Sequence, residues 1–588
     1  MSNQKLLKRR MWAVSAIVIL GCIVLLFPQI RQMVVSFIEQ YIVQRELRDH
    51  AKWMHRLFSY SLRGILVIIL FMFFFFTAPG IRLVERVLKK TRILLKEILV
   101  SIKTGLPEID YKYFIKPILV MAGIYLLGII SIIRADFPYA DDLQRMVIGW
   151  RGFFMWSRYV AEFLSILIHA DKTLTDISPL PQLLAILFLA ISSVILVYVL
   201  CDKKITVMGL VASIPLGLSL YFLGCLSWKF DAPYMALSVL ASIIPFLFVK
   251  AKKTFFVSSI LCLLIMCMSY QAASGVYILL TIILCFQDWN YKRNTGKEII
   301  SFAGVAAAAF CVSMLFFNFF LTRRLDTYAS TDTLALTQLL PGIARNVMRY
   351  VKWIVADFSL TWKRLILLCC IGFIIQTAIA SKQNKLLAFI ASLFAVFSLF
   401  ILSYGVYITL KRPLFEPRGL QGFGIFLAIL NVCLASQRKI ILNVPVFALN
   451  WAFFVFSFTY GNALADQKRY TAFRMTIVSR DIADLVSPNT TQDELSIQIV
   501  DTAGFSPSIK KNIAHRYPII NRLVPQYLDG GWYAYHYFQN HDLTIIQDSY
   551  LPDNYIDLTT LDLPVVVDSY YHTIKTDGEH ILVILKNQ

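Results

Sequence analysis

Residues 180–200 read LPQLLAILFLAISSVILVYVL, and residues 201–204 directly after them read CDKK. The first stretch carries no charge and is about as long as the 20 residues that a helix needs to cross a bilayer. Hydrocarbon offers no water to bond the backbone, so an apolar run of this length predicts a helix and not a barrel strand. The basic loop after it predicts that this transmembrane helix ends on the cytoplasmic side.

The same pattern recurs along most of the chain. Of its 588 residues, 58% are hydrophobic and only 16% are charged, whereas a soluble globular protein carries roughly 25% charged residues. We count about 13 candidate spans of helical length, centred near residues 20, 70, 124, 190, 215, 241, 261, 279, 311, 372, 396, 428 and 450. The sequence therefore predicts a mainly α, polytopic membrane protein.

The charges of the loops predict the side on which each loop lies. Residues 82–116 and five short loops are basic and belong inside by the positive-inside rule; the short loops are 201–204, 250–253, 292–297, 381–385 and 437–439. The intervening loops and everything after Gly461 then lie outside. We interpret the first apolar run, residues 11–27, as a retained anchor, because no small-residue cleavage site follows it. The expected cell-membrane protein has a cytoplasmic N-terminus and an external C-terminus.

Three regions are expected. The first, 1–110, has two spans and an amphipathic helix at 82–103 on the cytoplasmic leaflet. The second, 111–461, is the transmembrane core, with an external amphipathic helix at 143–168. The third, 462–588, is polar and predicts a small external α+β domain, with a helix at 507–521. Its β-type runs are 495–500, 543–546, 565–567 and 581–585.

Charge and cysteine content exclude two classes of partner. The basic cytoplasmic loops explain the formal net charge of +21, so the charge does not indicate a nucleic acid. The ten cysteines are scattered from Cys22 to Cys433 without a CxxC pair. This spacing argues against a disulfide framework or a zinc site.

The most informative stretch is residues 134–145, RADFPYADDLQR, directly after the span near residue 124. It places Asp136, Asp141 and Asp142 at the outer membrane surface. Three carboxylates so close together repel one another, so we expect them to serve a cationic ligand, a metal or proton transfer. The alternative is that Asp141 or Asp142 caps the surface helix that begins at residue 143.

Here the sequence resembles the GtrII-type bacterial glucosyltransferases of the GT-C superfamily. In that family an Asp-Asp-x-x-Arg element precedes a Gly, a Trp and a Gly-Arg pair. This chain has residues 141–145, DDLQR, then Gly149, Trp156 and Ser157-Arg158, with Ser157 in place of the expected Gly. Two further stretches are also similar to the family, SPLPQ at 178–182 and SYQA at 269–272. The resemblance covers roughly residues 115–460.

The resemblance implies a glycosyltransferase with an inverting mechanism. Its donor would be glucose on a polyprenyl-phosphate carrier such as undecaprenyl phosphate, and its acceptor a glycan outside the cell membrane. Asp136 would be the base, and Asp141 and Asp142 would position the acceptor. Such donors require no cofactor, but Mg²⁺ or Mn²⁺ between the carboxylates remains an alternative.

Other external residues are candidates for binding the substrate. The loop KRPLFEPR at 411–418 is a candidate phosphate site, with Glu416 orienting one arginine, although such a loop could instead contact lipid headgroups. Arg145 and Arg158 could bind phosphate or snorkel to the interface. The full set of candidates is Arg145, Arg158, Asp231, Gln271, Lys411, Arg412, Glu416 and Arg418.

Two other functions remain open at this point. A lipid-linked-sugar flippase or transporter needs charges at mid-depth in the membrane, whereas the notable charges here lie at the surfaces. A structural or sensory module that binds glycan through its external domain would leave the acidic loop at 134–145 unexplained.

Overall fold

The computed structural model describes residues 111–323, 332–436, 443–486, 496–529, 531–541, 545 and 556–587. The chain divides into two compact units, 1–104 and 105–588, and every described residue belongs to the second. The expected spans near residues 20 and 70 and the expected helix at 82–103 therefore lie outside the described residues.

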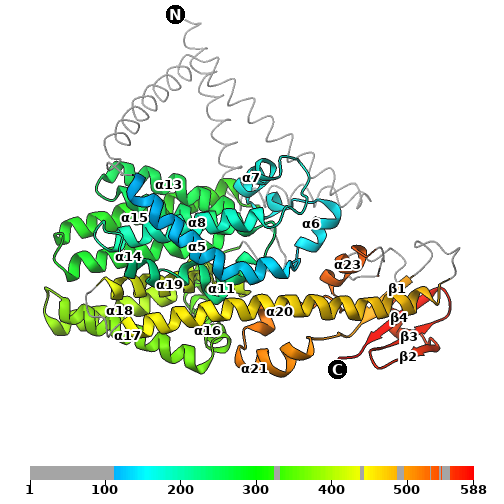
Figure 1. Cartoon of the computed structure of the whole chain (residues 1–588). Coiled ribbons are helices and arrows are strands. Elements are labelled where there is room, and N and C mark those ends of the chain that lie inside the picture. Colours follow the sequence, from blue (N-terminus) through cyan, green and yellow to red (C-terminus); the bar gives the residue numbers. More distant parts are fainter. Residues whose placement is uncertain are drawn as a thin grey trace, which may run out of the picture. The chain divides into compact units, whose positions relative to one another are not determined.

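Long apolar helices form most of the second unit (Figure 1). Among the described residues, nine helices are long and apolar enough to cross a membrane, or ten if one bent pair counts as a span. The nine are α5 (Tyr111–Ala135), α8 (Leu180–Leu200), α13 (Lys252–Ser269), α14 (Ser274–Asn290), α15 (Gly296–Phe316), α17 (Leu360–Ala380), α18 (Lys385–Leu402), α19 (Gly422–Ala435) and α20 (Val444–Ala483). Helices α14 and α19 reach this length together with the 3₁₀ turns before them, η3 (Gln271–Ala273) and η7 (Pro417–Leu420). Each coincides with an expected span.

The expected spans near residues 215 and 241 are interrupted. The first is divided into α9 (Val207–Ala212), α10 (Pro215–Leu218) and α11 (Leu220–Leu226), with a bend of 62° before α11. The second consists of α12 (Ala232–Ile243) and the 3₁₀ turn η2 (Ile244–Phe248). Pro215 and Pro245 explain the breaks before α10 and at η2, since they lack the N–H that a continuous helix needs. The bend before α11 lies at Ser219, whose backbone is extended.

The expected surface helix at 143–168 is also wrong as a single element. The chain forms α6 (Asp142–Ile148), the 3₁₀ turn η1 (Phe153–Trp156) and α7 (Tyr159–His169). Gly149 and Gly152 separate α6 from η1, with φ of 63° and 66°, and Ser157, with φ of 60°, ends η1 before α7. Such left-handed backbone ends a helix and is most easily adopted by glycine.

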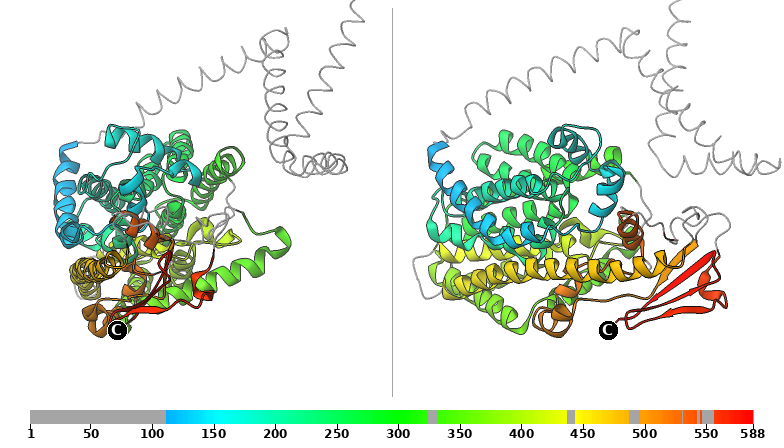
Figure 2. Two further views of the ribbon diagram at one scale, coloured as in Figure 1. Left: turned by 90° about the vertical axis from the view of Figure 1, so that its right-hand side faces the viewer. Right: turned by 45° about the vertical axis from the view of Figure 1, so that its right-hand side comes forward.

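Helix α20 connects the membrane core to the C-terminal part. It packs along α5, where the absence of a side chain on Gly461 allows close approach. A Cβ there would lie 2.5 Å from the Ser131 carbonyl carbon. The expected domain boundary at 461/462 falls inside α20, which continues to Ala483. Figures 1 and 2 show the C-terminal sheet at the far end of this helix, beyond the helical bundle.

The sheet contains four strands in the order β1-β4-β3-β2, with β1 parallel to β4 and the other pairs antiparallel. The strands are β1 (Ser496–Val500), β2 (Val565–Asp568), β3 (His572–Thr576) and β4 (His580–Leu585). The runs expected at 495–500, 565–567 and 581–585 are confirmed. The polar strand β3 is not predicted from its sequence, and of 543–546 only residue 545 is described.

The helix expected at 507–521 is interrupted before its end. It forms η10 (Ile509–Ile513), a π-helical turn, and α21 (Ala514–Arg516), and the chain resumes as α22 (Ile520–Leu523). Pro518 explains the interruption, because the residue before a proline avoids helical backbone.

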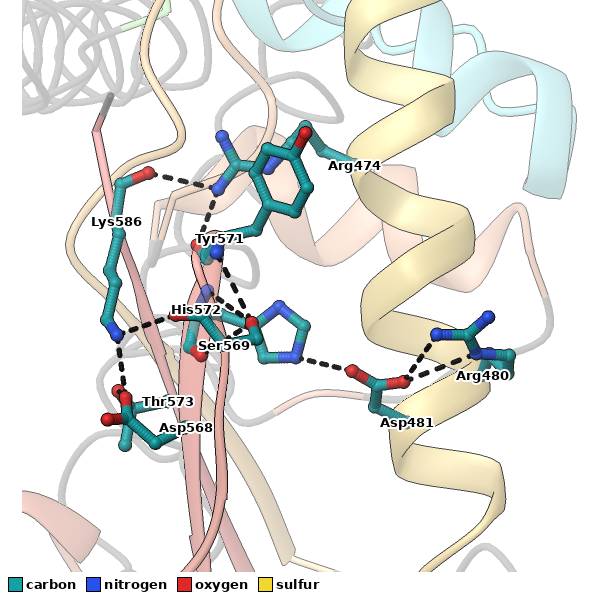
Figure 3. A network of polar contacts seen from close by, with 9 residues as sticks. All are labelled: Arg474, Arg480, Asp481, Asp568, Ser569, Tyr571, His572, Thr573 and Lys586. Carbon is teal, nitrogen blue, oxygen red and sulfur yellow. Dashed lines mark hydrogen bonds and ion pairs between the residues drawn. The ribbon is translucent and has the colours of Figure 1, made fainter.

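Buried polar contacts attach the sheet to α20 (Figure 3). The fully buried Arg474 donates hydrogen bonds to the carbonyl oxygens of Tyr571 (2.6 Å) and Lys586 (3.0 Å). His572 Nε2 lies 3.1 Å from an Asp481 carboxylate oxygen. A buried guanidinium is stable only when its donors are bonded, so these contacts fix the sheet on the end of the helix.

Candidate functional site

The loop that follows α5 turns sharply and is held by the C-terminal segment. Asp136 and Ala140 have φ of 46° and 51°, a conformation that costs about 1–3 kcal/mol in residues other than glycine. The Tyr527 hydroxyl accepts a hydrogen bond from the Ala140 N–H (2.7 Å) and donates one to the Pro138 carbonyl (2.8 Å). The Tyr527 ring stacks on Phe137 at 5.3 Å. Tyr527 therefore stabilises the strained turn.

The three carboxylates of this loop have different environments. Asp142 is buried and accepts hydrogen bonds from the backbone N–H groups of Tyr139 and Lys229, both at 2.9 Å. Asp141 occupies the N-cap position of α6, but its side chain makes no capping hydrogen bond. Asp142 thus joins two loops, and neither carboxylate caps the helix.

Asp136 belongs to an ionic cluster. The Lys229 ammonium pairs with both Asp136 and Asp176, the latter at 2.7 Å, and the Lys468 ammonium lies 3.2 Å from Asp136. Partial burial alone would raise the pKa of Asp136, but the hydrogen bonds and charges of the two lysines lower it below its usual value. Asp136 is therefore held ionised.

The Asp136 cluster lines a cavity of about 230 Å³, here called the smaller cavity. Its lining also includes Phe137 and Pro138 from the loop, residues of α20, and Tyr537 from α23 (Trp532–Gln539). Asn540 and His541, which follow α23, complete the wall.

We expect Asp142 to make folding stability fall as the pH rises. Burial raises its pKa to about 7, although the two backbone hydrogen bonds and Arg145 oppose this. An unfolded chain loses this proton near pH 3.9, so the stabilisation is complete below about pH 4 and is lost as the pH rises through about 7. Asp142→Asn imitates the protonated group, because its amide oxygen can still accept both N–H groups.

Thermal unfolding of the solubilised protein at pH 5 and pH 8 measures this effect. In the parent protein and in the control Asp562→Asn, the melting temperature should be lower at pH 8 than at pH 5. In Asp142→Asn this decrease should be smaller. Equal pH dependence in all three proteins would show that Asp142 does not carry the effect.

Four of the predicted binding residues lie in a separate region, where Arg145 and Asp231 are buried and Arg158 and Gln271 partly buried. Arg145 pairs with Asp231, and Arg158 lies 3.7 Å from the same carboxylate. The Arg145 guanidinium lies over the Phe153 ring at 4.5 Å, and Gln271 donates to the backbone carbonyl of residue 156 (3.1 Å). These residues do not line the smaller cavity or the larger cavity described next. Their contacts fix the segment around α6 and η1 on the core, and a role in binding substrate stays a prediction.

A larger cavity of about 750 Å³ contains three arginines and is here called the arginine cavity. Arg349 comes from the surface helix α16 (Leu339–Asp357), Arg418 from the turn η7 (Pro417–Leu420), and Arg522 from α22. The guanidinium of Arg349 lies over the Phe415 ring at 4.4 Å. That of Arg418 lies over Trp228 at 4.5 Å, and that of Arg522 over Trp353 at 4.0 Å. Such stacking orients an arginine and leaves its N–H edge for a ligand.

Two arginines of this cavity are held by further contacts. Arg418 Nε lies 3.1 Å from Glu416, so the structure contains the pairing that the sequence predicts. Arg522 pairs with the buried carboxylate of Asp357 and donates to the Phe415 carbonyl oxygen. The Asp357 carboxylate also accepts a hydrogen bond from Tyr221 at 2.8 Å. Arg522 therefore has little freedom to move.

The other basic residues of the predicted phosphate loop lie outside the cavity wall. Lys411 is exposed and pairs with Asp332 at 3.5 Å, and Arg412 is also exposed. The cavity wall begins at Pro413. Sequence reasoning thus identifies Arg418 and Glu416 of this cavity but not Arg349 or Arg522. For Arg349 the sequence offers one local signal, because Trp353 follows it by four positions and so lies on the same face of a helix.

The acidic loop does not fit a divalent cation. Asp136 already faces two ammonium groups, and the Asp142 side chain is buried behind the loop. Within the part of the chain that the structure describes, no group of three or more His, Cys, Asp or Glu side chains could hold a metal ion.

Comparison with known proteins gives a matching family model and a relative. The family model for "Glucosyl transferase GtrII" matches residues 130–429. A relative from Salmonella phage P22, named "Uncharacterized 55.3 kDa protein in gtrB 5'region", is 26% identical over 414 residues, which are 67% of this chain and 83% of the relative. No solved structure matches. The chain belongs to the GtrII glucosyltransferase family and is a glycosyltransferase.

Proposed function

We propose that the chain transfers glucose from a polyprenyl-phosphate carrier, such as undecaprenyl phosphate, to a cell-surface glycan on the outer face of the membrane. Family membership implies glucosyltransferase activity in surface-glycan modification. The single observation that carries the finer proposal is the arginine cavity. Arg349, Arg418 and Arg522 suit a phosphate group.

In the proposed reaction, an acceptor hydroxyl oxygen forms a bond to the anomeric carbon of glucose while the bond from that carbon to the phosphate oxygen breaks. The electron pair leaves with the phosphate, whose growing charge the arginines stabilise. The hydroxyl proton passes to a carboxylate. Attack opposite to the phosphate inverts the anomeric configuration.

Asp136 is the proposed proton acceptor. Its ionised state and its place on the smaller cavity support this role, because a base must be unprotonated and within reach of the hydroxyl. Asp141 would help to position the acceptor, since its carboxylate has no hydrogen-bond or ion-pair partner among the described residues. Asp142 would hold the loop through its two backbone contacts.

Loop charges support an external site. The arginine cavity draws its walls from segments that the positive-inside rule assigns to the outside, and these lie around residues 139–140, 228, 349–353, 413–418 and 502–533. Their convergence on one cavity is what a consistent set of external loops would produce. The proposed topology therefore keeps the active site and the C-terminal part outside.

We expect glucosyl transfer to proceed without a divalent cation. The arginines can neutralise the leaving phosphate, and the acidic loop does not fit a metal. Membrane vesicles that contain the chain should transfer at the same rate after treatment with EDTA. Loss of transfer that Mg²⁺ or Mn²⁺ restores would contradict the expectation.

The composition of the surface glycan tests the proposed function. Deletion of the gene should remove one glucosyl substituent from the glycan, and complementation should restore it. An unchanged glycan after deletion, in cells that make both the chain and the glycan beforehand, would contradict the proposal.

A further inference from the structure

The smaller cavity contains the proposed base, whereas the three arginines proposed to hold the donor phosphate line the arginine cavity. Asp136 lines it together with Asp176, Lys229 and Lys468. A base has to touch the hydroxyl that it deprotonates, so the group that enters this cavity carries that hydroxyl.

The charges of the smaller cavity cancel. Its two aspartates face its two lysines, and each lysine pairs with at least one of the carboxylates. The arginine cavity differs, because Arg349 has no carboxylate within ion-pair distance among the described residues. A balanced set of hydrogen-bond donors and acceptors favours an uncharged ligand with many polar groups, and a carbohydrate is such a ligand.

Aromatic rings and unused polar groups line the same cavity. Tyr527 and Tyr537 stack on one another at 5.8 Å and are both buried, which fixes this side of the cavity wall. The exposed side chain of Asn540 has no hydrogen-bond partner among the described residues. His541 Nδ1 lies 2.8 Å from the Tyr537 carbonyl oxygen, which can only accept, so Nδ1 donates to it and Nε2 is the ring nitrogen left for a ligand.

We propose that the smaller cavity is the acceptor subsite, and that Asn540 and His541 hold hydroxyl groups of the acceptor saccharide there. The inference rests on the proposed function. Phe137 and Pro138 line the smaller cavity, and the next two residues of the loop line the arginine cavity. One loop therefore lies against both ligands and brings the acceptor beside the donor.

This assignment also indicates which part of the chain determines the specificity for the acceptor. The family model ends at residue 429, whereas Tyr537, Asn540 and His541 lie well beyond it. The family-matched region supplies Asp136 and Arg418, and the C-terminal segment supplies the outer walls of both cavities. Acceptor preference is thus set by residues 537–541, outside the matched region.

Membrane vesicles that contain the full chain and labelled polyprenyl-phosphate glucose provide the test. The acceptor probe is the unmodified oligosaccharide released from the surface glycan of the deletion strain. Asn540→Ala and His541→Ala should each raise the KM for the oligosaccharide by about tenfold, as expected for a lost hydrogen bond. The KM for the donor should not change. His541→Gln keeps an acceptor group and should recover most of the loss.

Matched controls come from the same segment. Asn512→Ala and His515→Ala alter exposed residues away from both cavities and should behave like the parent protein. An active parent protein with unchanged oligosaccharide KM in both test variants would overturn the acceptor subsite alone. A raised donor KM would overturn it as well. A parent protein that transfers no label would overturn the proposed function and the subsite with it.

Discussion

Arg522→Gln should lower the rate of glucosyl transfer by about 10²–10³, the usual cost of removing one preorganised donor from a developing charge. Arg522 is fixed by Asp357, the Phe415 carbonyl and the Trp353 ring, so its place is not easily taken by another side chain. Glutamine keeps much of the length but loses the charge and the fork of N–H groups. Initial rates in vesicles measure the effect.

A loss of folded protein has to be separated from this loss of activity. Arg522→Gln leaves the buried Asp357 without its cation, which destabilises. Arg349→Gln is the better companion variant, because Arg349 is exposed and has no ion pair to lose among the described residues. Arg516→Gln alters an exposed arginine outside both cavities and is the control. If both cavity variants fold and transfer at the parent rate, the arginine cavity does not hold the phosphate.

Asp136→Asn should reduce transfer by about 10²–10⁴, the usual contribution of a positioned base. Asparagine has nearly the same shape and cannot accept the proton. Lys229 keeps its contact with Asp176 in this variant, so the loop should hold its fold. The rate at saturating donor and acceptor should fall, with little change in the amount of folded protein.

The pH profile gives this prediction a second measurement. The lysines lower the pKa of Asp136, so its ionised form persists to more acidic pH than that of an ordinary aspartate. Titration of Asp136 should therefore not reduce the parent rate between pH 7 and pH 5. Asp562→Asn serves as the control. Parent-like rates in Asp136→Asn would remove Asp136 from the reaction and leave Asp141 as the next candidate.

The membrane core could be predicted from local sequence because hydropathy determines it. Each expected span over the described residues corresponds to helical structure, and the interruptions lie at Pro215, Ser219 and Pro245. The breaks around α6 also had a local signal in Gly149 and Gly152. The strand β3 had too little, since Ile574 is the one apolar residue of HTIKT and the strand gains its place from pairing with β2 and β4.

The site was predictable only where its residues are neighbours in the chain. Glu416 and Arg418 are two positions apart, and their pairing could be expected from that spacing. Arg349 and Arg522 reach the same cavity from α16 and α22, and only the tertiary fold brings these helices together. For the same reason the sequence does not reveal that Arg145 is already engaged by Asp231.

The most direct test of the central claim is transfer by the purified chain in proteoliposomes that contain polyprenyl-phosphate [¹⁴C]glucose, with the unmodified glycan added. The account predicts that label moves from lipid to glycan, and that Arg349→Gln reduces this movement while Arg516→Gln does not. The account would be contradicted if the label stays on the lipid while the same proteoliposomes transfer glucose from a nucleotide sugar to the glycan.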